Sequence, residues 1–215
     1  MLTPRSAQKR EQILQAATAL FVEQGYGISM EAIAAKAQVS KQTVYAHFKT
    51  KDELFDTCIR ACCSDNQLDI SLMDDPRSPE QVLCDFAWRF QTMLLTDEAK
   101  NTYKTAVSQS ESHPELAAVY LHAGPEYTTQ MVAMYLTHLV EKGVLVSHLN
   151  CQHAALQLLM MFHGRSVYWA YLGQEGQETD AERKAYLASC VEMFLHGYKS
   201  ENRKINNCYL LKTTV

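Results

Sequence analysis

The chain has 215 residues, of which 47% are hydrophobic and 20% are charged. That balance is typical of a globular protein with a sizeable core, and no stretch approaches the run of about eighteen apolar residues that a membrane helix needs. The N-terminal segment lacks the apolar centre of a signal peptide, so we expect a cytoplasmic protein with no membrane partner. Glycine and proline number only 8 and 5, which favours long helices over a turn-rich β protein.

The N-terminal quarter of the chain predicts three helices and a tight turn. Apolar residues at helical spacing indicate a first helix over about residues 5–24, which ends at a glycine. Ser29 and Ser40 each stand directly before a short apolar-periodic run, where a serine hydroxyl accepts from the free N–H groups of a helix start. We therefore expect two further short helices, over about residues 30–38 and 41–48.

The third of these helices has one apolar face and one polar face. Val44 and Phe48 lie one helical turn apart and are expected to point inward. The outward side holds donors and acceptors of the kind that read base edges and phosphates in the major groove of DNA, namely Lys41, Gln42, Thr43, Tyr45 and His47. Two short helices joined by a tight turn have the shape of a helix-turn-helix DNA reader.

Charge and a further helix start support this interpretation. Thr50 and Glu53 fit a capping box, and the first-turn N–H groups there, with Lys51, are suited to hold a DNA phosphate. Residues 1–51 hold seven Lys or Arg and three acids, a net charge of +4, whereas the whole chain carries −4, so residues 52–215 carry −8. A basic head on an acidic body is the electrostatic footprint of a protein that binds nucleic acid at one end.

A long, ordered set of motifs lies between residues 13 and 55. In chain order these are Ile13-Leu14-Gln15-Ala16-Ala17, Leu20-Phe21, Gly25-Tyr26, Met30-Glu31-Ala32-Ile33-Ala34, Val39-Ser40, Thr43-Val44-Tyr45-Ala46-His47-Phe48 and Lys51-Asp52-Glu53-Leu54-Phe55. Together they resemble the DNA-binding domain of the TetR family of bacterial transcriptional regulators. The chain departs from the family pattern at Gln38, where glycine is common, and in the loop over residues 25–30, which is one residue shorter than usual.

The resemblance implies a homodimeric, mostly repressive regulator whose second domain binds a small molecule and thereby loosens the grip on DNA. It also implies that Ser29, Lys41, Thr43, Tyr45, His47 and Lys51 lie at or near the DNA, and Ser40 and Gln42 complete our predicted DNA-binding set. The expected partners are a double-stranded DNA operator, a second copy of the chain and a small-molecule effector. No cofactor is expected.

Caps and breaks organise the rest of the chain. Ser78, Thr96, Asn150 and Thr179 each open a helical run, and Gly124-Pro125 should kink or split another. We expect an all-α fold of about nine helices. It divides into a three-helix, helix-turn-helix DNA-binding domain in residues 1–50, a larger helical domain for effector binding and dimerisation in residues 51–200, and a polar C-terminal tail in residues 201–215.

The middle helices are rich in Met, Tyr and Trp, which suit a cavity for a poorly soluble organic ligand but also suit an ordinary core. The predicted ligand-binding residues are Phe90, Met93, Tyr103, Tyr127, Met131, Phe162 and His163. The last two helices are candidates for a four-helix dimer interface, as the resemblance implies. Their predicted apolar seam consists of Leu159, Phe162, Ser166, Ala170, Leu187, Val191, Phe194 and Tyr198.

Two other functions compete with this interpretation. A metal- or redox-responsive regulator would use Cys and His side chains, with candidates His113, His122, His138, His148, Cys151 and His153. Cys151 and His153 stand two apart on a predicted helix and so face different ways, and no metal site is predicted. The seven cysteines lack a C-x-x-C spacing, which is typical of free thiols. A small all-helical enzyme is less favoured, because the chain has no nucleophile–base motif and no glycine loop for phosphate.

Overall fold

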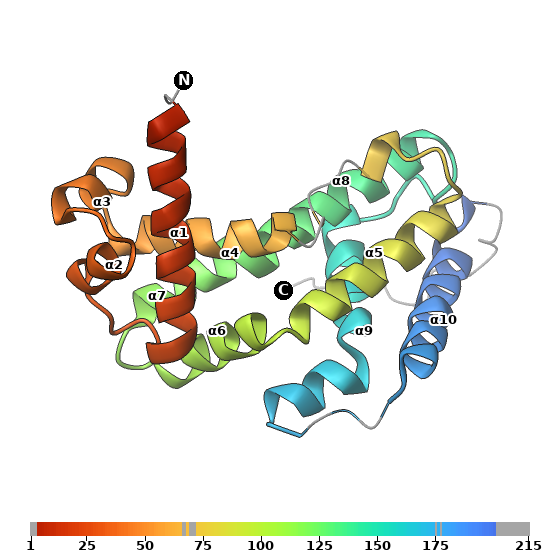
Figure 1. Ribbon diagram of the computed structural model, residues 1–215. Helices are drawn as coiled ribbons and strands as arrows, with labels where there is room; N and C mark the ends of the chain where they lie inside the picture. Colours follow the sequence, from red (N-terminus) through yellow and green to blue (C-terminus); the bar gives the residue numbers. More distant parts are fainter. Residues whose placement is uncertain (1–3, 66–67, 69–71, 175, 177, 201–215) are drawn as a thin grey trace, which may run out of the picture.

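The computed structural model describes residues 4–65, 68, 72–174, 176 and 178–200, and within them the fold is all-α, as predicted. Ten α-helices lie in these residues, with α7 and α8 joined through a π-helical turn. Helices α1 to α4 form a head at one end, and the remaining helices form an elongated body (Figure 1). The predicted polar tail, residues 201–215, lies outside the described residues.

The head contains α1 (Pro4–Gln24), α2 (Met30–Lys36), α3 (Lys41–His47) and α4 (Lys51–Asp65). Both predicted serine caps are confirmed. The Ser29 hydroxyl accepts from the N–H of Ala32 at 3.1 Å, and the Ser40 hydroxyl accepts from the N–H of Thr43 at 3.1 Å. Val44 is fully buried, so α3 packs its apolar face on the head and turns its polar face outward.

The turn between α2 and α3 contains Gln38 in the left-handed region, with φ of 55°. The N–H of Gln38 donates to the carbonyl of Ala35 at 3.1 Å, and the N–H of Val39 donates to that of Ala34 at 3.0 Å. Glycine adopts this conformation without a Cβ penalty, whereas glutamine pays on the order of 1 kcal/mol. The backbone of the turn therefore has a shape that suits glycine, although glutamine occupies this position.

The apolar core of the head extends beyond residue 50. It includes Leu54, Phe55 and Cys58 from α4 and Leu116 from α7. The first two turns of α4 therefore pack as part of the head. The division of the chain after residue 50 stays a prediction.

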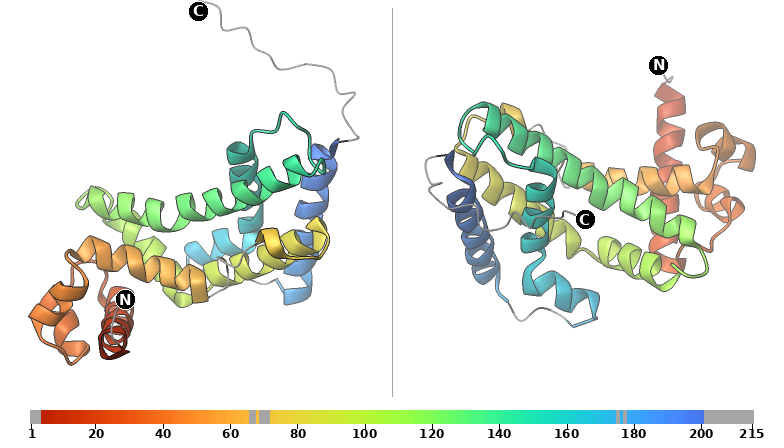
Figure 2. Two further views of the ribbon diagram at one scale, coloured as in Figure 1. Left: turned by 90° about the horizontal axis from the view of Figure 1, so that it is seen from above. Right: turned by 180° about the vertical axis from the view of Figure 1, so that it is seen from behind.

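The body begins with a short 3-10 helix, Leu72–Asp74, and continues through six α-helices. Figure 2 shows α8 running along one side of the body, from the end near the head toward α10. The predicted caps at Ser78, Thr96, Asn150 and Thr179 all accept a backbone N–H three residues on. The helices are α5 (Pro79–Leu94), α6 (Asp97–Ser108), α7 (Pro114–Leu121), α8 (Tyr127–Glu141), α9 (Cys151–Tyr171) and α10 (Asp180–Tyr198).

Gly124-Pro125 lies in the π-helical turn His122–Glu126, between α7 and α8. Proline has no N–H to donate to the preceding turn, so a local widening of the helix accommodates it. The Thr129 hydroxyl donates to the carbonyl of Pro125 at 2.7 Å. The predicted interruption is therefore present as a π turn, and the two helices stay continuous.

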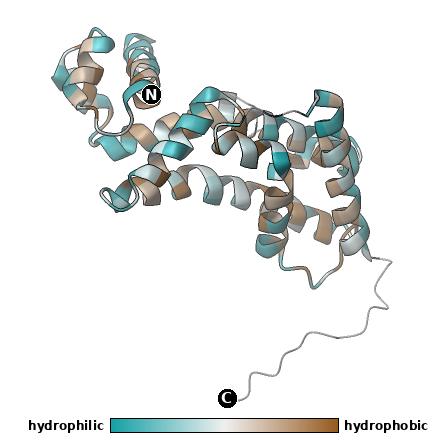
Figure 3. Cartoon of the chain, turned by 90° about the horizontal axis from the view of Figure 1, so that it is seen from below, coloured by the Kyte–Doolittle hydropathy of each residue, from teal (hydrophilic) through white to brown (hydrophobic). Residues whose placement is uncertain are grey.

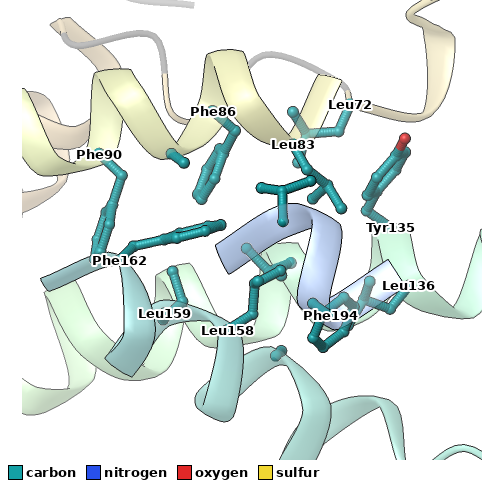
Figure 4. Close-up of a cluster of buried hydrophobic side chains, with 14 of the residues drawn as sticks. Leu72, Leu83, Phe86, Phe90, Tyr135, Leu136, Leu158, Leu159, Phe162 and Phe194 are labelled. Atoms are coloured by element: carbon teal, nitrogen blue, oxygen red, sulfur yellow. The ribbon is translucent and has the colours of Figure 1, made fainter. Parts of the chain in front are cut away.

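The core of the body lies between α5, α8, α9 and α10, where Phe86, Phe162 and Phe194 come together with leucines from each helix (Figure 4). The helices that surround it carry both hydrophilic and hydrophobic residues (Figure 3). This core corrects the predicted dimer seam. Six of the eight residues of the predicted seam are buried within a single chain and are not available to a second copy: Leu159, Phe162, Ser166, Leu187, Val191 and Phe194. The apolar stripe on these helices packs inward.

Helix α9 breaks at Gly164, where the sequence pattern predicts a continuous helix. Gly164 has φ of 57° and ψ of −167°, a region open essentially only to glycine. The side-chain amide of Gln91, from α5, donates to the carbonyl of Phe162 at 2.9 Å, next to the break. Its oxygen accepts from Nε of Arg183 on α10 at 2.8 Å. Polar groups from two neighbouring helices therefore hold the break in place.

Replacing Gly164 with alanine should lower the free energy of unfolding by about 3 kcal/mol, since the backbone conformation is strained for alanine. A Cβ at this position would also stand only 2.7 Å from Cε1 of Tyr186. Gly197 in α10 is the matched control, because a Cβ there meets nothing within 4 Å. Gly197→Ala should change stability by less than about 1 kcal/mol. Urea unfolding of both variants checks this, and equal effects would contradict it.

Candidate DNA-binding surface and ligand cavity

The outer face of α3 presents most of the predicted DNA-binding residues to solvent. Ser40, Lys41, Gln42 and Tyr45 are exposed, and Tyr45 is 43% exposed despite its large ring. Thr43 and His47 are half-buried at the edges of the same face, and Ser29 is exposed at the start of α2. A helix with this many outward donors and acceptors has the chemistry to read base edges.

Two acids reduce the positive charge of the head. Lys41 pairs with Glu31 across the turn, and Lys36 pairs with Glu23 at 3.1 Å. The hydrogen bond from Lys41 lowers the pKa of the Glu31 carboxyl, and the same contact raises the pKa of Lys41. Both side chains are exposed to solvent, so the Lys41–Glu31 pair contributes little to stability. Its main effect is to place a negative charge beside the face of α3.

Lys51 points into the head. Its ammonium donates to the backbone carbonyl of Tyr26 at 2.8 Å and to that of Ile28 at 3.3 Å. It also lies 4.1 Å from the centroid of the Tyr26 ring. Partial burial lowers the pKa of this lysine. In this structure Lys51 therefore fixes the loop before α2, and its predicted contact with a phosphate stays a prediction.

A cavity of about 600 Å³ lies between the head and the body. This volume falls within the range of about 300–1,000 Å³ that is typical of small-molecule sites. Four of the seven predicted ligand-binding residues line the cavity: Phe90, Met93, Tyr103 and His163. Three do not. Phe162 is fully buried in the core, Met131 lies outside the lining, and the ring of Tyr127 packs against the guanidinium of Arg60, 4.8 Å from the ring centroid.

Sequence reasoning missed much of the cavity wall. Tyr120, Leu121, Met160, Tyr168 and Tyr171 line it from α7 and α9. Several belong to the Met- and Tyr-rich set that the composition singles out, but helical spacing alone does not show which way each one points. The walls also include residues of α1 and α4, which the predicted domain division assigned to separate domains.

Three tyrosines form an aromatic cluster on the cavity wall. The rings of Tyr103 and Tyr171 stack with centroids 4.0 Å apart and an interplanar angle of 16°. Tyr120 meets Tyr103 edge-on at 6.2 Å. Burial raises the pKa of Tyr120 to about 12, and it raises the pKa of Tyr171 as well. The phenols of Tyr120 and Tyr171 are therefore neutral donors at physiological pH, and the rings of the cluster have flat faces that can stack on an aromatic ligand.

His163 supplies an acceptor to the cavity. Its Nδ1 lies 2.9 Å from the carbonyl of Leu159, which can only accept, so Nδ1 carries the proton. Burial lowers the pKa of the imidazole. The ring is therefore neutral near pH 7, with an unprotonated Nε2. Because His163 lines the cavity, this nitrogen suits a ligand with a hydroxyl to donate.

The charged groups around the cavity are few. Among the described residues that line it there is one acid, Glu98, and no lysine or arginine. An anionic ligand would lose its hydration here without gaining a cationic partner. The arrangement therefore favours an uncharged ligand.

Cysteines are also present on the wall, at positions 58, 62 and 63 of α4. Burial raises the pKa of the Cys58 thiol to about 12, which makes it a poor nucleophile. In the described part of the chain, no group of three or more His, Cys, Asp or Glu side chains is placed to hold a metal ion. His153, one of the histidines considered for a metal- or redox-responsive regulator, is exposed on α9.

The outward faces of α9 and α10 carry large apolar side chains. Met160 and Trp169 on α9 are 55% and 40% exposed, and Tyr186 and Met193 on α10 are 40% and 62% exposed. We name these four residues the outer apolar face. They are among the exposed apolar residues of the last two helices, and Met160 also lines the cavity. No described helix is long and apolar enough to cross a membrane.

A helix-turn-helix head with a donor-rich outer helix, joined to a body with an apolar cavity, defines a ligand-responsive DNA-binding regulator. The chain belongs to the TetR family: residues 13–58 match the bacterial regulatory proteins of the tetR family, and residues 81–200 match the C-terminal domain of AefR-like transcriptional repressors. It is accordingly a transcriptional regulator and not an enzyme. It dimerises and binds operator DNA and a small-molecule effector.

Individual relatives agree with this assignment. The transcriptional repressor BepR of Brucella suis is 27% identical over 178 residues, which cover 80% of this chain and 84% of BepR. The structure resembles that of a TetR-family regulator from Mesorhizobium loti, with 29% identity, a TM-score of 0.74 and coverage of 92% of this chain and 100% of the other. It also resembles the flavonoid-responsive regulator FrrA, with 28% identity, a TM-score of 0.72 and coverage of 90% and 98%.

Removing the acid beside Lys41 should strengthen DNA binding. Glu31→Gln frees the Lys41 ammonium and deletes a negative charge near the face of α3, so operator affinity should rise by about three- to tenfold at low salt. Fluorescence anisotropy with labelled operator DNA measures this at several salt concentrations. Glu23→Gln, which frees Lys36, is the control and should have a smaller effect. Unchanged binding by Glu31→Gln would show that Lys41 does not face the DNA.

The buried neutral His163 should make stability fall in mild acid. Its folded pKa lies below the ordinary value of 6.5. The unfolded chain therefore takes up a proton first, and the free energy of unfolding decreases as pH drops below about 6.5. The loss is complete below the folded pKa. Urea unfolding between pH 7.5 and 5 should show a shallower decline for His163→Gln than for the unchanged protein. His153→Gln, which alters an exposed histidine, should leave the decline as it was.

Proposed function

We propose that this regulator is a cytoplasmic repressor that leaves its operator when an uncharged aromatic compound fills the cavity between head and body. The observation that carries the proposal is the composition of the cavity wall. It combines three tyrosines and a neutral histidine with no lysine or arginine among its described residues. Such a wall offers stacking surfaces and hydrogen bonds but no partner for a carboxylate or a phosphate.

The DNA-binding part of the proposal assigns base contacts to the exposed face of α3. Lys41, Gln42, Thr43 and Tyr45 supply the side-chain donors and acceptors, with Ser29, Ser40 and His47 at the margins. In a dimer, two such helices about 34–36 Å apart enter successive major grooves of a near-palindromic site. The operator sequence depends on the detailed contacts of these side chains.

The outer apolar face is the proposed dimer contact. Met160, Trp169, Tyr186 and Met193 lie on the two helices whose counterparts the family uses for a four-helix interface. Exposure of large apolar side chains to water is unfavourable in free energy, and pairing with a second copy would bury them. The buried residues of the predicted seam pack in the core of the body, on the opposite side of these two helices.

The effector class follows from the shape and charge of the cavity. Tyr103 and Tyr171 offer a stacked pair, and His163 offers an acceptor for a hydroxyl. Flavonoids are aromatic compounds with several phenolic hydroxyls, and the similar protein FrrA is described as flavonoid-responsive. Binding lowers operator affinity only if the compound prefers a body conformation that does not fit the DNA spacing.

Binding and release are tested with two probes of opposite character, the flavonoid naringenin and the fatty-acid anion palmitate. Naringenin should bind the purified protein in calorimetry and weaken its binding to operator DNA obtained by selection from a random library. Palmitate should do neither, because its carboxylate meets no cation in the cavity. Release by palmitate but not by naringenin would overturn the proposed effector class.

Loss of one stacking ring should weaken naringenin binding. Tyr103→Leu removes a face of the aromatic cluster and should reduce affinity by about tenfold, corresponding to about 1.4 kcal/mol. Tyr127→Leu is the matched control, because Tyr127 lies outside the cavity and its loss should leave the affinity unchanged. Calorimetric titration compares the two. An equal loss in both variants would indicate that the compound binds elsewhere.

A further inference from the structure

The DNA-binding head itself contributes a wall of the cavity. Thr18, Phe21 and Val22, all from α1, line the cavity alongside Phe55 and Cys58 from α4. A compound in the cavity therefore lies against the first helix of the head as well as against the body. This arrangement gives the effector direct access to the element on which α2 and α3 are packed.

Phe21 belongs to the core of the head as well as to the cavity wall. It is only 4% exposed and packs with the apolar residues of α1, α2 and α4. Its ring meets Phe55 edge-on with centroids 4.9 Å apart and stacks on Tyr26 at 5.9 Å. Tyr26 and Phe55 are in turn 5.4 Å apart. These three rings, which we name the head aromatic cluster, form a continuous contact from the cavity to the loop before α2.

Tyr26 anchors that loop. Its hydroxyl donates to the carboxylate of Asp52 on α4, and its carbonyl accepts from the ammonium of Lys51 at 2.8 Å. Lys51 also holds the carbonyl of Ile28 at 3.3 Å. Ser29, the cap of α2, follows directly. A shift of the head aromatic cluster therefore acts on the segment that sets where α2 begins.

The body touches the same segment from a second side. Gly25, at the end of α1, has φ of 74°, and a Cβ there would stand 3.5 Å from Cγ2 of Thr105 and 3.4 Å from Nε2 of Gln109. Both side chains belong to the end of α6 or follow it directly, and α6 also carries Tyr103 into the cavity. The junction between α1 and the loop is thus confined between the head aromatic cluster and α6.

We propose that the effector acts on the head by direct contact with α1, through Thr18, Phe21 and Val22, and that the head aromatic cluster passes this contact to the loop before α2. This inference rests on the proposed effector function of the cavity. It adds a route to the one through α4, which joins head and body in the chain. Phe21, Phe55 and Tyr26 are positioning residues in this route, because they act on α2 and α3 without touching DNA.

A side chain grown into the cavity from α1 tests this without any effector. Val22→Phe fills the head side of the cavity and should weaken operator binding by about tenfold in the absence of added compound. Leu156→Trp adds bulk to the cavity from α9, on the body side, and should weaken operator binding by less than Val22→Phe does. Fluorescence anisotropy with the selected operator gives the affinities, and circular dichroism and sedimentation confirm that each variant is a folded dimer.

Thr18→Met is a second head-side variant, used if Val22→Phe does not fold. The proposal is supported if a folded head-side variant loses more operator affinity than Leu156→Trp does. It is overturned if folded head-side variants bind the operator normally, or if Leu156→Trp weakens binding as much as they do, since contact with α1 then adds nothing to filling the cavity. Naringenin binding is measured separately. Its absence would remove the proposed effector class and leave the result on α1 intact.

Discussion

The packing of Phe21 against Phe55 is the contact on which the arrangement of head and body depends. Phe21 comes from the first helix of the head, and Phe55 comes from the helix that leads into the body, so their edge-on contact at 4.9 Å joins these two helices. Tyr26 completes the cluster and fixes the loop that leads to the helix-turn-helix. Because both phenylalanines also line the cavity, the contact that holds the head in position is the one a bound compound meets.

Local features of the fold could be predicted from the sequence because they depend on neighbours in the chain. Serine, threonine and asparagine caps act over three residues. Ser29, Ser40 and Thr179 each cap the helix that the sequence predicts to begin there. The inward placement of Val44 and Phe48 follows from one turn of helical spacing. The motifs in residues 13–55 carried the resemblance to the TetR family, and the family matches agree with it.

The parts that could not be predicted depend on contacts between distant residues. An apolar stripe such as Leu187, Val191 and Phe194 looks the same whether it packs on its own subunit or on another. The lining of the cavity depends on how α1, α4, α6 and α9 are brought together, so four of the seven predicted ligand-binding residues line it, and the contribution of α1 was not predicted. The sequence pattern does not reveal the break at Gly164, because the side chain that holds it comes from far away in the chain. Gln91 approaches the carbonyl of His163, which lies 72 residues later.

Gly164 is subject to two separate constraints that respond differently to genetic change. The steric constraint comes from the ring of Tyr186, and a smaller residue at position 186 would remove it. The torsional one comes from the backbone angles themselves, and no substitution elsewhere relieves it while α9 stays broken. Shrinking Tyr186 would in addition forfeit the hydrogen bond from its hydroxyl to the carbonyl of Met161. A second mutation that shortens Tyr186 would therefore make room for a side chain at position 164, but it would not relieve the backbone strain there.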